Sequence, residues 1–189
     1  EGQPTAVTMA SFDETCVKKG QHIFHSPTFR VYTSLDPIGI EIAGALKNVV
    51  AIAAGACVGL GFKSNALSAL ITRGLAELTR FGATLGANPL TFNGLGGVGD
   101  LFLTCSSKKS RNYTVGFRLA QGESLGEITK TLGSVAEGVA TTKAAYQLGL
   151  KQGVRMSITT AVYRVLYEDM QVKQAVYDLL NASSRQEFE

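Results

Sequence analysis

The sequence is poor in cysteine, histidine and net charge, and each shortage argues against a class of protein. Its three cysteines, Cys16, Cys57 and Cys105, form an odd set without a C-x-x-C pair. This argues against a disulfide framework and favours reduced thiols in a cytoplasmic protein. The two histidines, His22 and His25, have no third ligand near them in sequence, so we interpret them as surface residues and expect no metal site. A net charge of +3 over 189 residues is too small to indicate nucleic-acid binding.

The sequence also lacks a leader and a long apolar run. No charged segment followed by an apolar one opens the chain, so no signal peptide is predicted. The most apolar stretch, residues 48–62, is shorter than the ~20 residues that a membrane-spanning helix needs, and it is rich in glycine. We therefore expect this stretch to lie in a protein core and predict no integral membrane segment.

What the sequence does contain divides into two unequal parts. With 45% hydrophobic residues, the chain can bury a core as one or two domains. Residues 5–11 and 29–34 have strand-like patterns, and they flank a helix-like segment that begins near Asp13. A strand–helix–strand unit of this size cannot cover both faces of a sheet by itself. We therefore predict that residues 1–35 are the C-terminal remnant of an α/β domain, and that the chain is a fragment of a longer protein.

From Asp36 onward the pattern is helical, and we assign residues 36–189 to a second domain. Asp36 followed by proline is a helix-start signal for a long apolar helix. A second long helix is predicted to begin with Ser64 or Asn65 as its cap and to end at Gly86; three of its residues are interpreted as a structural ion-pair set, namely Arg73, Glu77 and Arg80. Shorter helices are predicted over 100–105, 124–133, 139–150, 158–168 and 172–180, with a polar loop over 106–112.

Lys47 is the residue of the apolar helix that most needs a partner. Its neighbours at helical spacing are all small or apolar: Ala43, Gly44, Val50 and Ala51. An unpaired ammonium in a dry interior is costly, so Lys47 requires a carboxylate, an anion or a polar ligand nearby. Two interpretations stay open, a catalytic or ligand-binding cation and a buried lysine in a structural salt bridge. Asp100 fits both as the partner.

Residues 94–99 read G-L-G-G-V-G, a literal G-x-G-x-x-G pattern. A dinucleotide-binding fingerprint is one interpretation, but the preceding residues 90–93 make a poor central strand. Asp100 would also repel a pyrophosphate at the start of the following helix. We favour the interpretation that these glycines let the backbone approach a neighbouring helix or a ligand, with Asp100 placed as an anion at a helix start.

Ser110, Arg111 and Asn112 offer a hydroxyl, a guanidinium and an amide within one short turn. Such a set suits a phosphate, which accepts forked hydrogen bonds and attracts positive charge. An ordinary solvated loop is the alternative. If these residues form one site with Lys47 and Asp100, their side chains should converge on a shared cavity.

Four motifs in order resemble those of the bacterial-type NAD(P)-dependent glycerol-3-phosphate dehydrogenases. They are G-A-L-K-N-V at 44–49, L-I-T-R-G-L-A-E at 70–77, G-L-G-G-V-G-D-L-F-L-T-C at 94–105 and S-R-N at 110–112. The resemblance covers nearly the whole chain and implies a mainly α fold. An all-helical substrate domain, like the C-terminal domain of 6-phosphogluconate dehydrogenase, would follow a short β-α-β remnant of a Rossmann domain. The family is usually dimeric.

The resemblance also implies residue roles toward the substrates, dihydroxyacetone phosphate and sn-glycerol 3-phosphate. Lys47 corresponds to the lysine that polarises the substrate carbonyl and exchanges the proton, and Asp100 corresponds to the aspartate beside it. Ser110, Arg111 and Asn112 match the phosphate-contacting triplet of the family. The implied reaction feeds glycerophospholipid synthesis.

For the cofactor, NAD or NADP, the resemblance implies three contacts from the helical side. Arg111 would reach the cofactor as well as the phosphate, and Val135 and Glu137 fall on positions where the family touches it. The glycine fingerprint and the first half of the nucleotide-binding sheet have no counterpart in this sequence. We therefore expect the chain by itself to be catalytically inactive.

Two alternative functions remain open from the sequence. The chain could be a helical dimerisation module in which a buried pair of Lys47 and Asp100 is purely structural. It could also belong to a related dehydrogenase that uses the same helical architecture on another hydroxy acid, although the Ser-Arg-Asn turn favours a phosphate ester.

Overall fold

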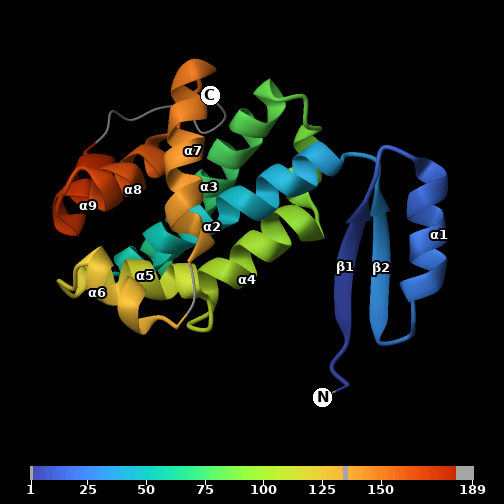
Figure 1. Ribbon diagram of the computed structural model, residues 1–189, viewed down its shortest axis with the longest axis horizontal. Helices are drawn as coiled ribbons and strands as arrows, with labels where there is room; N and C mark the ends of the chain where they lie inside the picture. Colours follow the sequence, from blue (N-terminus) through green and yellow to red (C-terminus); the bar gives the residue numbers. More distant parts are fainter. Residues whose placement is uncertain (1, 134–135, 182–189) are drawn as a thin grey trace.

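The computed structural model describes residues 2–133 and 136–181, and Figure 1 shows two parts of unequal size. The smaller part consists of β1 (Thr5–Ala10), α1 (Glu14–Phe24) and β2 (Phe29–Ser34). The two strands pair in parallel, with Thr5 opposite Phe29 and Ala10 opposite Ser34. Asp13 caps α1 by accepting hydrogen bonds from the backbone of the first turn. The predicted strand–helix–strand unit is therefore confirmed.

The larger part is a set of helices built around α2 (Pro37–Gly59). This helix contacts α3 (Ser64–Thr84), α4 (Asp100–Ser106), α5 (Arg111–Ala120), α7 (Glu137–Lys151) and α8 (Ser157–Tyr167). In the part of the chain that the structure describes, α2 is the one helix long and apolar enough to cross a membrane, and 56% of its most apolar stretch is buried by protein. Its place among the other helices is that of the core helix that the sequence predicts.

No helix was predicted at the place of α5. The polar loop predicted over residues 106–112 overlaps the first two residues of this helix. Ser110 caps α5, and the helix packs along α2 at two glycines. A Cβ atom on Gly55 would overlap the carbonyl oxygen of Tyr113, and one on Gly116 would overlap that of Ile52. The α5 sequence is short and contains a central glycine and two β-branched residues, all poor helix formers. Tertiary packing against α2 therefore provides the stability that local propensity does not.

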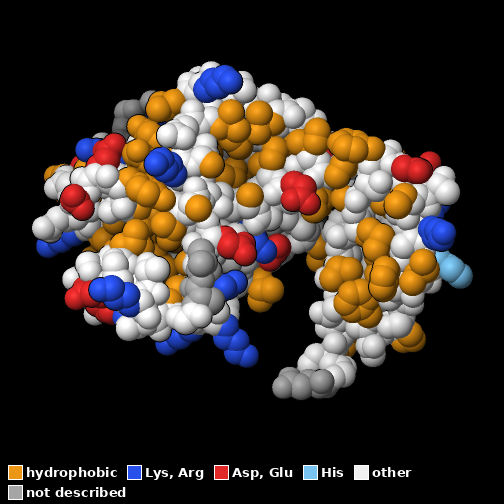
Figure 2. All heavy atoms as spheres, viewed as in Figure 1, with side chains coloured by type: hydrophobic (Ala, Val, Ile, Leu, Met, Phe, Trp, Pro, Cys, Tyr) orange, Lys and Arg blue, Asp and Glu red, His pale blue; other side chains and the backbone are white. Residues whose placement is uncertain are grey.

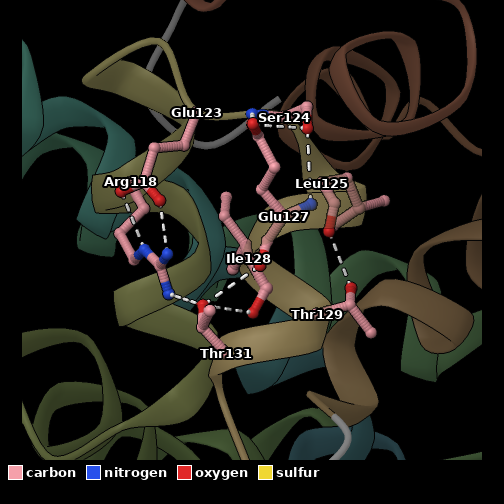
Figure 3. A network of polar contacts seen from close by, with 8 residues as sticks. All are labelled: Arg118, Glu123, Ser124, Leu125, Glu127, Ile128, Thr129 and Thr131. Atoms are coloured by element: carbon pink, nitrogen blue, oxygen red, sulfur yellow. Dashed lines mark hydrogen bonds and ion pairs between the residues drawn. The ribbon is translucent and has the colours of Figure 1, made fainter.

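Two short helices complete the framework, α6 (Leu125–Thr131) and α9 (Val172–Leu180). Figure 3 shows the junction of α5 and α6, where Ser124 and Glu127 form the predicted capping box. Arg118 forms an ion pair with Glu123 and donates a 2.8 Å hydrogen bond to Thr131. The mutual hydrogen bonding raises the pKa of Arg118 and lowers that of Glu123. This polar junction holds α6 against the end of α5.

The predicted N-cap of α3 is wrong in detail. The helix begins at Ser64 without a side-chain cap, because its N-cap position is Lys63.

Glu77 accepts three hydrogen bonds from the start of α8, two from backbone N–H groups and one from the hydroxyl of Thr159, at 2.7–2.9 Å. Burial to 2% exposure raises the pKa of Glu77, although these hydrogen bonds and the charge of Arg80 oppose the shift. Glu77 thus joins two helices rather than belonging only to an ion-pair set along one.

Asp36 joins the start of α2 to η1 (Pro89–Asn93) and the turn before it. Its carboxylate accepts hydrogen bonds from the backbone of Gly39 and Asn88, both at 2.9 Å, and from the hydroxyl of Thr91 at 2.6 Å. Burial raises the pKa of Asp36, but these hydrogen bonds outweigh it and hold the pKa below its ordinary value. The ionised carboxylate therefore stabilises the folded state.

We expect Asp36→Asn to lower the free energy of unfolding by about 1 kcal/mol at pH 7, because an N-cap oxygen and its charge are both changed. The folded-state pKa lies below the unfolded value, so the contribution is present above about pH 4 and disappears as the pH falls through the folded-state pKa. Urea unfolding at pH 7 and pH 3 measures both effects. Asp169→Asn, at an exposed position with φ of 54°, is the control; an equal loss at both pH values would contradict the assignment.

Candidate functional site

The structure pairs Lys47, in the middle of α2, with Asp100, the first residue of α4. The ammonium donates a hydrogen bond to Asp100 Oδ2, forming an ion pair between residues 53 positions apart. The two side chains are 22% and 35% exposed. The prediction that Lys47 lies in a dry interior is therefore wrong, whereas the predicted partner is correct.

The reason for this exposure is that one side of α2 carries no neighbouring helix at this level. Glu41 and Ala45 are exposed, and a Cβ atom on Gly44 would meet no atom of the described residues within 4 Å beyond the adjoining backbone of its own helix. Gly44 lies one turn before Lys47 on the helix, so open space adjoins the ammonium. This arrangement leaves room for a small ligand in contact with Lys47.

A compact run of glycines positions Asp100. Residues 89–93 form the 3₁₀ helix η1, and Leu95–Gly99 forms a π-helical turn, η2, that continues into α4. A Cβ atom on Gly96 would lie 2.7 Å from Ile40 Cδ1 of α2, so the absence of a side chain permits the close approach. No strand precedes the glycines in this described stretch, which excludes the dinucleotide fingerprint and confirms the packing interpretation.

Thr104 is a member of this cluster that the sequence reasoning missed. Its hydroxyl donates to the Asp100 carbonyl oxygen at 2.6 Å and lies 3.3 Å from Asp100 Oδ1. The contact orients the carboxylate that faces Lys47. The spacing Asp-x-x-x-Thr at a helix start was the available signal, because residues four apart lie on one face.

The Ser110, Arg111 and Asn112 triplet has three separate environments rather than one loop. Ser110 is the N-cap of α5 and accepts a hydrogen bond from the backbone of Tyr113 at 3.3 Å. Arg111 is the first residue of the helix and is exposed, whereas Asn112 is only 7% exposed. The Asn112 amide donates to Asn48 Oδ1 and accepts from the Gly138 backbone, both at 2.9 Å.

These last contacts bring the start of α7 to the same region. Glu137 is the first residue of α7 and is exposed. Val135, the other predicted cofactor contact on this segment, lies outside the described residues. Asn112 thus connects the N-termini of α5 and α7 to α2 at the residue that follows Lys47.

Neither of two cavities between the described residues is the expected shared cavity. A cavity of about 900 Å³ lies between α2, α3, α8 and α9 and has a mainly apolar lining. A second, of about 420 Å³, lies between the strands and the glycine run. Neither is lined by Lys47, Asp100 or Arg111. Figure 2 shows instead acidic and basic side chains meeting beside an open notch between the helical part and the strand unit. Lys47 and Asp100 are partly exposed and Arg111 is exposed, so the candidate site is open to solvent.

The remaining reactive side chains do not form a second site. Burial raises the pKa of Cys105 to about 12 and also raises that of Cys57, so both thiols stay protonated and unreactive. His22 and His25 are exposed on or next to α1, as predicted. Within residues 2–133 and 136–181, no three histidine, cysteine, aspartate or glutamate side chains gather as a metal site would require.

Comparison with known proteins gives consistent results. Residues 36–177 match the family profile described as "NAD-dependent glycerol-3-phosphate dehydrogenase C-terminus". A glycerol-3-phosphate dehydrogenase [NAD(P)+] of Limosilactobacillus fermentum is 52% identical over 98% of this chain and 55% of its own length.

Solved structures agree. The crystal structure of glycerol-3-phosphate dehydrogenase from Coxiella burnetii has a TM-score of 0.92 at 40% identity and is matched over 95% of this chain and 55% of that one. Glycerol-3-phosphate dehydrogenase from Saccharomyces cerevisiae has a TM-score of 0.83 at 30% identity, over 92% of this chain and 54% of that one. The chain spans about half the length of the curated relatives it matches.

We expect Gly44→Ala to raise the free energy of unfolding by about 0.5–1 kcal/mol, because alanine is the better helix former and no atom obstructs its methyl group. Gly55→Ala, on the same helix, is the matched control and should be strongly destabilising, because its methyl group would overlap the α5 backbone. Urea unfolding of the two variants measures the difference. A destabilised Gly44→Ala protein would show that the space beside Lys47 is filled.

Proposed function

Since the chain belongs to the family of NAD-dependent glycerol-3-phosphate dehydrogenases, we propose that it is the substrate-binding and catalytic-acid domain of such an enzyme. The enzyme would interconvert dihydroxyacetone phosphate and sn-glycerol 3-phosphate with NAD(P)H. The observation that carries the proposal is the pairing of Lys47 with Asp100 beside open space on α2.

Lys47 would act on the carbonyl group of the substrate. NAD(P)H, when bound, supplies the hydride that the C2 carbon receives, and the carbonyl oxygen gains negative charge as its π bond breaks. The ammonium of Lys47 would stabilise that charge and give its proton to the oxygen, which completes the hydroxyl group. Asp100 would hold the ammonium in place, and Thr104 would orient Asp100.

The substrate phosphate would bind where α5 and α7 begin. The hydrogen bond between Asn112 and Gly138 brings the two helix N-termini together, and helix N-termini attract anions. Arg111 is exposed at the first position of α5 and can extend a forked guanidinium toward a phosphate. Ser110 and Asn112 add a hydroxyl and an amide from the same turn. Binding energy from the phosphate would orient the reacting carbon near Lys47.

The residues present fit a cofactor contact from the helical side only. Arg111 and Glu137 are exposed at the two adjoining helix starts, which suits the polar parts of NAD or NADP. We assign Val135 the same role. The parallel pair of strands over residues 1–35 would be the remnant of the nucleotide-binding domain, with the helical domain over 36–189. On this assignment the chain by itself does not catalyse the reaction, because most of the nucleotide-binding domain is not part of it.

The proposal also covers the setting of the enzyme. The protonated buried thiols Cys57 and Cys105 support a cytoplasmic location. The resemblance supports a homodimer and a place in glycerophospholipid synthesis. A purely structural role for the pair of Lys47 and Asp100 has less support, because a partly exposed salt bridge contributes only about 0–1 kcal/mol.

For the full-length enzyme, we expect Lys47→Ala to lower kcat by about 10²–10⁴-fold, because the proton donor and the positive charge are both removed. Steady-state oxidation of NAD(P)H with dihydroxyacetone phosphate measures the rate, and circular dichroism checks the fold. Lys63→Ala, at an exposed lysine before α3, is the matched control. Near-normal kcat in a folded Lys47→Ala protein would rule out the proton role.

We expect Arg111→Ala to raise KM for dihydroxyacetone phosphate by roughly 10–100-fold, with a smaller effect on kcat, because charge-assisted hydrogen bonds to the phosphate are lost. Initial rates over a range of substrate concentrations give both constants. Arg155→Ala removes an exposed guanidinium near the start of α8 and should leave KM unchanged. An unaltered KM in Arg111→Ala would exclude the phosphate contact.

A further inference from the structure

Three buried polar groups from three helices form a continuous chain beside the candidate site. Asn48 of α2 donates to the carbonyl oxygen of Gly44 at 3.3 Å and accepts from Asn112 of α5 at 2.9 Å. Asn112 in turn accepts from the backbone N–H of Gly138 in α7 at 2.9 Å. Asn48 and Asn112 are 8% and 7% exposed. These groups therefore exchange hydrogen bonds with one another largely away from water.

The direction of every bond in this chain follows from its two backbone ends, a donor in α7 and an acceptor in α2. The Gly138 N–H can only donate, so Asn112 must present its oxygen to α7 and its nitrogen to α2. The nitrogen of Asn112 then requires an acceptor, which is the oxygen of Asn48, and the nitrogen of Asn48 points to Gly44. The Gly138 N–H and the Gly44 carbonyl oxygen thus select the same orientation of both amides from opposite ends of the chain.

The chain also satisfies a helix start that has no cap of its own. The N-cap position of α7, Ala136, offers no side-chain acceptor, and Gly138 is the second residue of the helix. The first N–H groups of a helix have no intrahelical partner, and a buried one is costly when left unpaired. Asn112 fills this role from another helix. A Cβ atom on Gly138 would lie 2.7 Å from Asn112 Oδ1 and 2.8 Å from the Asn48 carbonyl oxygen, so α7 approaches both helices closely.

Each member of the chain directly follows a residue of the proposed site. Lys47 precedes Asn48, Arg111 precedes Asn112 and Glu137 precedes Gly138. The three buried groups therefore set the relative positions of the helix turns that carry the three site residues. A change in the buried chain would move these exposed side chains relative to one another without touching any of them.

We propose that Asn48 is a positioning residue, which holds the turns of Arg111 and Glu137 in register with Lys47 by giving the Asn112 side chain its acceptor on α2. The inference rests on the proposed function. Removing the Asn48 amide leaves the nitrogen of Asn112 without its acceptor on α2, so Asn112 and the start of α7 that it caps are no longer tied to the turn of Lys47. The pair of Lys47 and Asp100 makes no hydrogen bond to this chain, so the chemical step should be less affected than ligand binding.

The test uses the full-length enzyme and its two substrates. For Asn48→Ala we expect KM for dihydroxyacetone phosphate to rise about tenfold and KM for NAD(P)H to rise several-fold, with kcat reduced less than about threefold. Gly138→Ala disturbs the same chain from its other end without removing a buried side chain, and it should give the same division between KM and kcat. The pair of variants keeps the test decisive if one of them does not fold.

Thr159→Val is the matched control, because it removes a buried hydrogen bond, to Glu77, that joins α8 to α3 and involves no residue of the proposed site. It should lower Tm and leave both KM values unchanged. If folded Asn48→Ala or Gly138→Ala enzyme behaves like this control, with both KM values within about twofold of the unaltered enzyme, the positioning role is wrong. Absence of dihydroxyacetone phosphate-dependent oxidation in the unaltered enzyme would instead overturn the proposed function.

Discussion

The contact between α2 and α5 is the constraint on which the rest of the helical part depends. Gly55 and Gly116 have no side chains, so the backbones of the two helices touch, with the carbonyl oxygens of Tyr113 and Ile52 occupying the space of a methyl group. At this distance neither helix can slide or rotate without a clash, because protein interiors are densely packed. The start of α5, with Ser110 to Asn112, is thereby held at a fixed place along α2. The location of the candidate site follows from that placement.

At the candidate site the charged side chains are partly exposed, whereas the neighbouring side-chain amides are buried. Lys47 and Asp100 are partly exposed, which avoids most of the cost of removing two ions from water. Asn48 and Asn112 lie below them and satisfy one another without net charge. A neutral, hydrogen-bonded pair of amides next to a partly exposed ion pair gives rigidity at small desolvation cost, while the ammonium stays accessible to a ligand. This arrangement suits a proton donor better than a deeply buried lysine would.

Several features could be predicted from the sequence because their causes are local. The Asp36 cap, the capping box at Ser124 and the strand–helix–strand pattern each depend on residues close together in the chain. Asp100 could also be named as a fitting partner for Lys47, because it is a carboxylate at a predicted helix start next to the glycine run, although the expected dry interior around Lys47 was wrong. Helix α5 was missed for the opposite reason. Its own residues favour a helix only weakly, and the packing surface that stabilises it lies on α2, more than fifty positions earlier.

The sequence by itself determined the family, the mainly helical fold, the start of the apolar helix and the identity of its ionic pair, because motifs, caps and unpaired charges are properties of short segments. Only the tertiary structure decided that Lys47 is partly exposed, that Glu77 binds the start of α8, and that Asn112 is buried against Asn48 and Gly138. Those outcomes depend on which helices lie side by side. At those contacts residues far apart in the chain lie close together, and a short sequence pattern cannot predict such a contact.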